Sequence, residues 1–222
     1  MGFTRKIQYF LVHTLKYSNK QAKDLILKGA VYVNNTEVTD NILLNLTDEI
    51  KVNNQVVKTH HTFVYIAYHK PIGLVSSLNP NVEFSLHDTF KNYFPLYIAG
   101  RLDKYSQGLM LLSSNGKWVK NIIDPEQFKE KEYVVKVNMP YSANFLTLLE
   151  NRVDIGFYIT KPCKCTKIDN HTFKIILTEG KNKQIKRMCK ALGYRVIELK
   201  RVRIGDIEIG NMLPGEIQML KI

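Results

Sequence analysis

Residues 100–116 read GRLDKYSQGLMLLSSNG, and this stretch predicts a loop fixed to a buried strand. Arg101 and Asp103 lie two residues apart behind a glycine, which lets a loop approach another backbone closely. The apolar run at 109–112 is typical of a strand in a core. A carboxylate beside a cation, on a loop backed by a rigid strand, is suited to chemistry. Taken alone, such an aspartate is more typical of a turn or a helix cap than of a catalytic residue.

The composition predicts a protein that binds nucleic acid. The chain has 222 residues, 45% of them hydrophobic, which is enough for one full core and a small second domain. The longest apolar runs, such as residues 63–68, are too short to cross a bilayer, and no signal peptide opens the chain. The net charge of +12 favours nucleic acid over a membrane, because no amphipathic anchor or polybasic tail is present. We therefore expect a soluble, cytoplasmic monomer.

The positive charge is concentrated towards the C-terminus. Residues 1–58 carry a net charge of +3 and residues 59–222 a net charge of +9. Residues 181–203 hold nine lysines and arginines against one acid, Glu198. This segment is predicted to be the main patch that contacts a nucleic-acid backbone.

No metal site or cofactor is expected. Cys163, Cys165 and Cys189 are odd in number and lack metal-ligand spacing, so three reduced thiols are the favoured interpretation. The adjacent residues His60 and His61 also lack partners at ligand spacing. They lie in a polar stretch, residues 59–62, which is predicted to be a linker.

Residues 1–58 are predicted to form a small α/β domain. Ser18 and Gln21 form a capping box, Gly29 stands where a helix C-terminal cap belongs, and Asn34-Asn35 favours a hairpin turn. The expected order is helix, helix, hairpin and strand, over residues 5–14, 18–29, 31–38 and 49–52.

This order, with SNKQAKDLILKGAVYVNN at residues 18–35, resembles the S4 RNA-binding domain. The resemblance implies that Lys20 and Lys23 on the second helix contact RNA. The alternative is a generic α+β unit whose lysines form a solvated face.

Residues 63–222 are predicted to form a second domain, so that the whole chain belongs to the α+β class. Strands are expected over residues 64–68, 109–113, 132–137 and 172–178, and helices over 117–123, 143–152 and 183–192. Asn182 is expected to cap the last helix and Gly193 to end it. Strands and helices do not alternate strictly and no phosphate-binding glycine loop is present, which favours a mixed, largely antiparallel sheet.

Four segments of this domain, in order, resemble motifs of the RsuA-type rRNA pseudouridine synthases. They read YHKPIG at 68–73, GRLDKYSQGL at 100–109, KEY at 131–133 and LTEGKNKQIKRM at 177–188. Details such as SQG and the KEYVVKV strand resemble the RluB/RluE/RluF group, and its RluF branch above all. The resemblance implies a cofactor-free enzyme that isomerises uridine to pseudouridine in rRNA, with 23S rRNA the expected substrate and tRNA an alternative.

The resemblance implies three catalytic residues. Asp103 would act at the ribose of a flipped-out uridine, either by adding to C1′ or by removing the 2′ proton. Tyr133 would stack on the uracil, and Lys186 would keep the Asp103 carboxylate ionised. Further RNA contacts are expected from Arg101, Lys70, Lys183, Arg187 and Lys190.

Two other functions are open to the same residues. One is an S4-bearing ribosome-assembly factor whose synthase domain no longer turns over, although Asp103, Tyr133 and Lys186 are all present. The other is a hydrolase acting on a glycosidic bond, which would need a second carboxylate that no recognisable spacing supplies. Lysines at 181 and 183, where the family often has arginine, would replace bidentate phosphate contacts by point charges.

Overall fold

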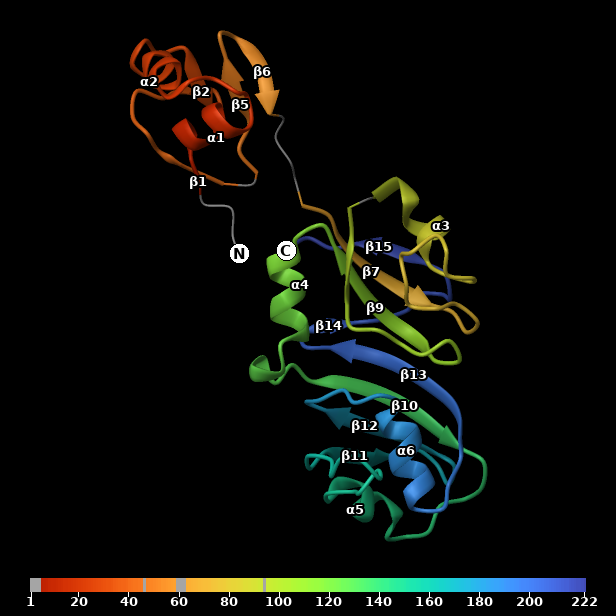
Figure 1. Ribbon diagram of the computed structural model, residues 1–222. Helices are drawn as coiled ribbons and strands as arrows, with labels where there is room; N and C mark the ends of the chain where they lie inside the picture. The colour runs from red at the N-terminus through yellow and green to blue at the C-terminus, as the bar shows by residue number, and fades with distance from the viewer. Residues whose placement is uncertain (1–4, 46, 59–62, 94) are drawn as a thin grey trace. The chain divides into compact units, whose positions relative to one another are not determined.

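The computed structural model describes residues 5–45, 47–58, 63–93 and 95–222 (Figure 1). The chain divides into two compact units, Met1–Phe63 and Val64–Ile222. We call them the N-terminal and the C-terminal unit. The linker predicted at residues 59–62 lies outside the described residues.

The N-terminal unit packs two helices against a small sheet. Its core joins Ile7 and Ala22 from the helices to Val31 and Ile50 from the strands. The strand order is β3-β2-β5-β6, and β1 pairs separately with β4. The elements are β1 (Arg5–Lys6), α1 (Ile7–His13), α2 (Asn19–Leu27), β2 (Val31–Val33), β3 (Thr36–Glu37), β4 (Leu43–Leu44), β5 (Ile50–Val52) and β6 (Gln55–Lys58).

Local signals in the sequence explain these boundaries. Ser18 and Gln21 form both halves of the predicted capping box. Asn34 and Asn35 have φ values of 51° and 65°, as a tight hairpin turn requires, and asparagine tolerates this region well. The pair Asn53-Asn54 repeats the device and joins β5 to β6, a strand that the sequence analysis did not predict.

The C-terminal unit is built on one nine-stranded sheet. The strand order is β11-β12-β10-β13-β9-β7-β15, with β14 paired to β13 and β8 to β9. Every pairing in the described residues is antiparallel except that of β13 with β9, so the sheet is mixed and largely antiparallel. The strands are β7 (Tyr65–Lys70), β8 (Tyr97–Ala99), β9 (Gln107–Ser113), β10 (Lys131–Val137), β11 (Lys164–Lys167), β12 (Thr172–Leu177), β13 (Val196–Ile204), β14 (Ile207–Glu208) and β15 (Ile217–Met219).

Helices cover both faces of this sheet. Side chains alternate along β9, so Leu109 and Leu111 pack with α4 on one face, whereas Met110 and Leu112 belong to the core on the other face. That second core also receives α5 and α6, and Figure 1 shows α6 lying across β10 and β12. The helices are α3 (His87–Phe90), α4 (Gly116–Ile123), α5 (Phe145–Glu150) and α6 (Gln184–Ala191).

The start of α6 differs from the prediction. The N-cap is Lys183 rather than Asn182, and Lys183 adopts a left-handed conformation with φ of 51° and no side-chain capping bond. The helix does end as expected, because Gly193 follows it with φ of 88°. None of the helices in the described ranges has the length and apolarity needed to cross a membrane.

The two halves of the sheet meet at a short parallel joint. Only two residue pairs connect β13 to β9, Lys200 with Gln107 and Arg201 with Gly108. Gly108 has φ of 113°, and a Cβ there would run into the backbone of Arg201, so glycine is required. The loop that carries Asp103 joins β8 to β9 and therefore lies beside this joint.

Candidate active site

A pocket of about 630 Å³ lies where the loop after β8, strand β10 and the start of α6 meet. Asp103, Tyr133 and Lys183 line it, together with Arg101 and Arg201. The four motif segments therefore differ in their position relative to the pocket. The segments around 103, 133 and 183 reach the pocket, and the segment at 68–73 supports it from behind, as the contacts of Lys70 show.

Arg201 fixes the beginning of the Asp103 loop. Its side chain is 1% exposed, and its Nε donates to the carbonyl of Leu109 at 2.7 Å. The two terminal nitrogens donate to the carbonyls of Gly100 at 2.9 Å and Arg101 at 3.4 Å. A planar guanidinium with several donors can hold three carbonyls at once, so this buried charge sets the path of the loop.

Ser76 holds the residue that precedes Asp103. Its hydroxyl donates to the carbonyl of Leu102 at 2.6 Å and accepts the Leu102 N–H at 3.0 Å. Both backbone groups of one residue are thus satisfied by a single buried side chain. Such support keeps the neighbouring carboxylate within a narrow range of positions.

Lys70 holds the end of the same loop and is completely buried. Its ammonium donates to the carbonyls of Pro71 and Ser106 at 2.8 Å each, and to that of Lys104 at 3.4 Å. Burial lowers the pKa of Lys70 to about 8, with Asp103 opposing the change and Lys186 and Arg201 adding to it. The prediction that Lys70 contacts RNA is wrong for this structure, because the side chain has no exposed surface.

Asp103 and Lys186 form an ion pair: Asp103 lines the pocket, and Lys186 follows the lining residue Ile185 on α6. The Lys186 Nζ lies 3.6 Å from the Asp103 Oδ2, and the two side chains are 28% and 31% exposed. The carboxylate is therefore only partly buried. A cation at this distance favours the charged form of the carboxylate.

Tyr133 forms another part of the pocket lining. It lies on β10, is 8% exposed, and pairs across the sheet with Arg201 on β13 and Ile175 on β12. Lys131 precedes it on the same face of the strand and also lines the pocket. Burial lowers the pKa of Lys131, and the nearby charge of Arg201 lowers it further.

The wall opposite Asp103 is shaped by Glu179 and Gln184. Glu179 accepts hydrogen bonds from the Gln184 side chain at 2.6 Å, the Tyr158 hydroxyl at 2.8 Å and the Lys161 N–H at 3.0 Å. Gln184 also accepts the Lys181 N–H at 2.9 Å. These bonds fix the turn before α6, which explains why the LTEG and Q positions occur in one motif.

Cations and aromatic rings gather beside this wall. The Lys181 ammonium lies 4.2 Å from the centre of the Tyr158 ring, and the Arg187 guanidinium lies 5.0 Å from that of Phe157. The Phe157 side chain is 59% exposed. Exposed rings beside cations can stack on unpaired bases while the charges meet phosphates.

The basic segment at 181–203 is not one continuous surface, contrary to the prediction. Arg201 is buried, and Arg203 is paired with Glu130 at 2.8 Å and Glu132 at 3.1 Å. The exposed cations of this segment are Lys181, Lys183, Arg187, Lys190 and Arg195. The exposed charge available to RNA is therefore smaller than the count of nine cations indicated.

Two positioning residues escaped the sequence analysis. Arg201 follows Leu199 by two residues on β13, so an arginine stands on a face where an apolar residue is expected, and this was the available signal. Ser76 has no comparable signal, because its partner Leu102 is 26 residues away in the sequence. No group of three or more histidine, cysteine, aspartate or glutamate side chains in the described part of the chain is arranged to hold a metal ion.

Comparison with known proteins agrees with this geometry. The family model for RNA pseudouridylate synthases matches residues 64–191. The dual-specificity RNA pseudouridine synthase RluF of Escherichia coli K12 is 34% identical over 201 residues, which cover 90% of this chain and 69% of that protein. The ribosomal large subunit pseudouridine synthase B of Bacillus subtilis is 28% identical over 224 residues, 97% of this chain and 91% of that protein.

The fold of this chain is similar to that in a crystal structure of a pseudouridylate synthase. Its TM-score is 0.66 at 27% sequence identity, with 98% of this chain and 96% of that chain covered. The chain belongs to the RNA pseudouridylate synthase family. Within that family it is an RNA pseudouridine synthase of the RluB/RluF-like, RsuA-type group.

Proposed function

We propose that this enzyme isomerises a specific uridine of 23S ribosomal RNA, with Asp103 acting at the ribose of a flipped-out nucleotide. The observation that carries the proposal is the Asp103 carboxylate on a braced loop, 3.6 Å from the Lys186 ammonium, at the edge of a pocket lined by Tyr133. The choice of large-subunit rRNA is supported by the relative from Bacillus subtilis that is named for it. The alternative substrates are small-subunit rRNA and tRNA.

The reaction needs no oxidant, reductant or added group. The bond from N1 of the uracil to C1′ of the ribose breaks, the base turns over, and a bond from C5 to C1′ forms. The proton on C5 leaves and N1 takes up a proton, so atoms and electrons balance within the nucleotide. The residues proposed for these steps are all carried by the protein chain.

Asp103 has two possible roles in this sequence of steps. It adds to C1′ and holds the ribose while the base turns, or it removes the 2′ proton and so weakens the glycosidic bond. Both roles require an ionised carboxylate, which the Lys186 ammonium favours. Tyr133, on the pocket wall, is the proposed surface against which the uracil stacks.

The competing hydrolase function is disfavoured by the second acid of the pocket. Glu179 is that acid, but its oxygens already accept three hydrogen bonds from Tyr158, Lys161 and Gln184. These bonds hold the Glu179 side chain in the turn before α6, where it supports the pocket wall. Glu179 is instead a structural residue, which leaves Asp103 as the reactive carboxylate.

We further propose that the N-terminal unit is an S4-like RNA-binding domain, whereas the chemistry belongs to the C-terminal unit. Helix α2 begins with a complete capping box and presents Lys20 and Lys23 as exposed side chains. In the C-terminal unit, Arg101, Lys183, Arg187 and Lys190 are exposed and are the proposed contacts to the RNA backbone. These lysine and arginine contacts make binding dependent on salt.

The decisive experiment is the substitution Asp103→Asn, which removes the charge but almost no volume. Single-turnover isomerisation should fall by about 1,000-fold or more, while the affinity for an rRNA fragment stays unchanged. Pseudouridine is mass-silent, so product is measured by carbodiimide labelling and primer extension. Asp206→Asn, at an exposed turn, is the matched control. Near-normal product from Asp103→Asn would exclude the assignment.

The substrate is identified by a second measurement. Pseudouridine is mapped in rRNA and tRNA from cells that carry or lack the gene, or that carry only Asp103→Asn. Loss of one 23S position in both mutant strains supports the proposal. If pseudouridine is lost only from small-subunit rRNA or tRNA, that RNA is the substrate instead of 23S rRNA. The proposed reaction would stay the same.

A further inference from the structure

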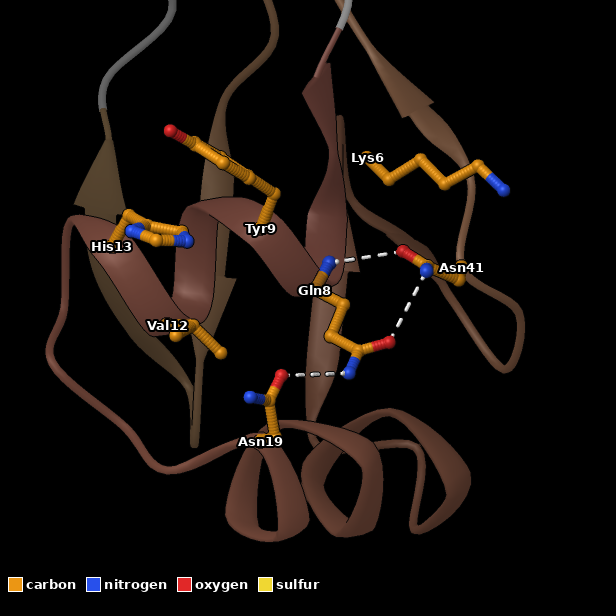
Figure 2. Close-up of a pocket in the computed structure, with 7 residues that line it drawn as sticks. All are labelled: Lys6, Gln8, Tyr9, Val12, His13, Asn19 and Asn41. Atoms are coloured by element: carbon orange, nitrogen blue, oxygen red, sulfur yellow. Dashed lines mark hydrogen bonds between the residues drawn. The ribbon is translucent and has the colours of Figure 1, made fainter.

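A second pocket lies entirely within the N-terminal unit and has a volume of about 430 Å³. Figure 2 shows side chains from β1, α1, the start of α2 and the segment before β4 around it. None of its lining residues belongs to the proposed catalytic machinery. Lys20 and Lys23, the RNA contacts proposed on α2, also do not line it.

Two aromatic rings form one side of this pocket. Tyr9 and His13 lie one turn apart on α1, and their rings stack with centroids 4.0 Å apart and an interplanar angle of 26°. Tyr9 is 37% exposed, and His13 is exposed as well. The stacked pair therefore presents a flat aromatic surface to solvent beside a concave site.

Three amide side chains form the other side. The backbone N–H of Gln8 donates to the Asn41 Oδ1 at 3.0 Å, and the Asn41 amide donates to the Gln8 Oε1 at 3.2 Å. The Gln8 amide donates in turn to the Asn19 Oδ1 at 3.3 Å (Figure 2). Each amide nitrogen carries two hydrogens, so these bonds hold the cluster in place and leave further donors for a ligand.

The charge around the pocket is positive. Lys6 lies at its edge and is exposed, and no acidic side chain is found among the described lining residues. An aromatic surface, fixed amides and a lysine are the groups that proteins use for an unpaired base and its phosphate.

We propose that this pocket binds one unpaired RNA nucleotide, outside the substrate uridine, with its base stacked on the Tyr9–His13 pair. The amides of Gln8, Asn19 and Asn41 hydrogen-bond to the edge of the base, and Lys6 contacts the adjoining phosphate. This inference rests on the proposed function in RNA modification. It adds a recognition site that acts through affinity and placement rather than through chemistry.

Affinity measurements on the full chain test the aromatic surface. Tyr9→Leu removes the ring and should weaken binding of an rRNA fragment by roughly 5- to 100-fold, whereas Tyr9→Phe keeps the ring and should bind normally. The single-turnover rate at saturating RNA should be unchanged in both variants. Equal affinities for Tyr9→Leu and the unaltered chain would overturn the proposal.

The phosphate contact is tested with a matched pair. Lys6→Gln should weaken binding and make its salt dependence shallower, while Lys28→Gln, an exposed lysine outside the pocket, should change both less. Photocrosslinking with RNA that carries 4-thiouridine should label a peptide containing Tyr9 or His13. Crosslinks confined to other peptides, together with normal binding by Tyr9→Leu, would show that the pocket is not used.

The outcomes separate this inference from the proposed function. If the double variant Lys20→Gln/Lys23→Gln weakens binding but Tyr9→Leu does not, the N-terminal unit binds RNA without this pocket. If neither variant changes affinity, the unit does not contact RNA and both statements about it fail. The catalytic assignment is decided independently by the product formed with Asp103→Asn.

Discussion

On one wall of the active-site pocket, the Asp103 loop is held by side chains from distant parts of the chain, whereas on the other wall the turn before Lys186 is held by side chains nearer in the sequence. Arg201 reaches the loop from 101 residues away and Ser76 from 26. In the other turn, Glu179 bonds to Gln184 five residues away, and to Lys161 and Tyr158 at 18 and 21 residues. The two walls therefore have different kinds of support.

The different supports of the two walls indicate which part of the pocket needs a precisely fixed position. The Asp103 loop is braced by buried donors that satisfy its carbonyls one after another, because a reactive carboxylate must be held within about 0.5 Å of its working position. The opposite wall keeps exposed cations beside aromatic rings, and these can adapt to an RNA backbone. In the proposed function, the first wall serves the reaction and the second serves binding.

Among substitutions that test the difference between the two walls, Arg201→Met should cause the largest loss of stability and activity. The change removes the donors of three carbonyls, so the free energy of unfolding should fall by about 3 kcal/mol or more. Single-turnover activity should fall too, because the loop loses its brace. Urea unfolding and kinetics measure both effects. Arg195→Met, at an exposed position just before β13, should change neither; comparable losses for the two variants would mean that the brace is not specific.

The next largest effect is expected at the ion pair between Lys186 and Asp103, which connects the two walls. Lys186→Met should reduce the single-turnover rate by about 100-fold, because the cation beside the Asp103 carboxylate is lost. Lys190→Met changes an exposed lysine of the same helix that is not the ion-pair partner of Asp103, and should leave the rate nearly intact. Small and equal losses for both lysines would show that the ion pair has no catalytic part.

A third prediction uses the lowered pKa of Lys70, which is about 8 in the folded chain against 10.5 for an ordinary lysine. Below pH 8 both states are protonated and the cost of burying the charge is fully present. As the pH rises from 8 to 10.5, the unfolded state holds more protons, so this penalty is progressively relieved and the free energy of unfolding rises. Between pH 7 and 9.5 the unfolding free energy, taken relative to Lys70→Met, should rise by about 2 kcal/mol. A flat difference would contradict the assigned pKa.

The smallest effect is expected on the binding wall. Lys183→Gln should reduce the slope of log affinity against log salt by about 0.9, the contribution of one phosphate contact. The rate at saturating RNA should stay the same, because Lys183 is not near a reacting atom in the proposed mechanism. Salt titrations with an rRNA fragment measure the slope. A lower rate at saturating RNA would show that Lys183 contributes to the reaction and not only to RNA binding.

Local patterns predicted the parts of the fold that depend on neighbours in the sequence. The capping box of Ser18 and Gln21 and the turn at Asn34-Asn35 both follow from residues one to three positions apart. The burial of Met188 and Cys189 on α6 is explained by the same kind of local spacing. Resemblance then added the roles of the motif residues, which spacing alone did not supply.

Long-range contacts explain what the sequence could not predict. Strand β13 carries alternating charges, and its central place in the sheet comes from pairing with β10 and β9 rather than from its own apolarity. Lys70 was expected to be exposed and to contact RNA. It is buried instead, because its ammonium donates hydrogen bonds to three backbone carbonyls. Lys183 replaced Asn182 as the cap because the turn of Glu179 and Gln184 sets the backbone there.

The joint between β13 and β9 also determines when the enzyme becomes active during its own synthesis. The carbonyl of Leu109 and its donor Arg201 are 92 residues apart in the sequence. At a synthesis rate of about 5–20 residues per second, the Asp103 loop waits roughly 5–20 s for the strand that braces it. Contacts of such long range also close slowly once the chain is complete. The nascent protein should therefore be unable to modify RNA until β13 has been made and has joined the sheet.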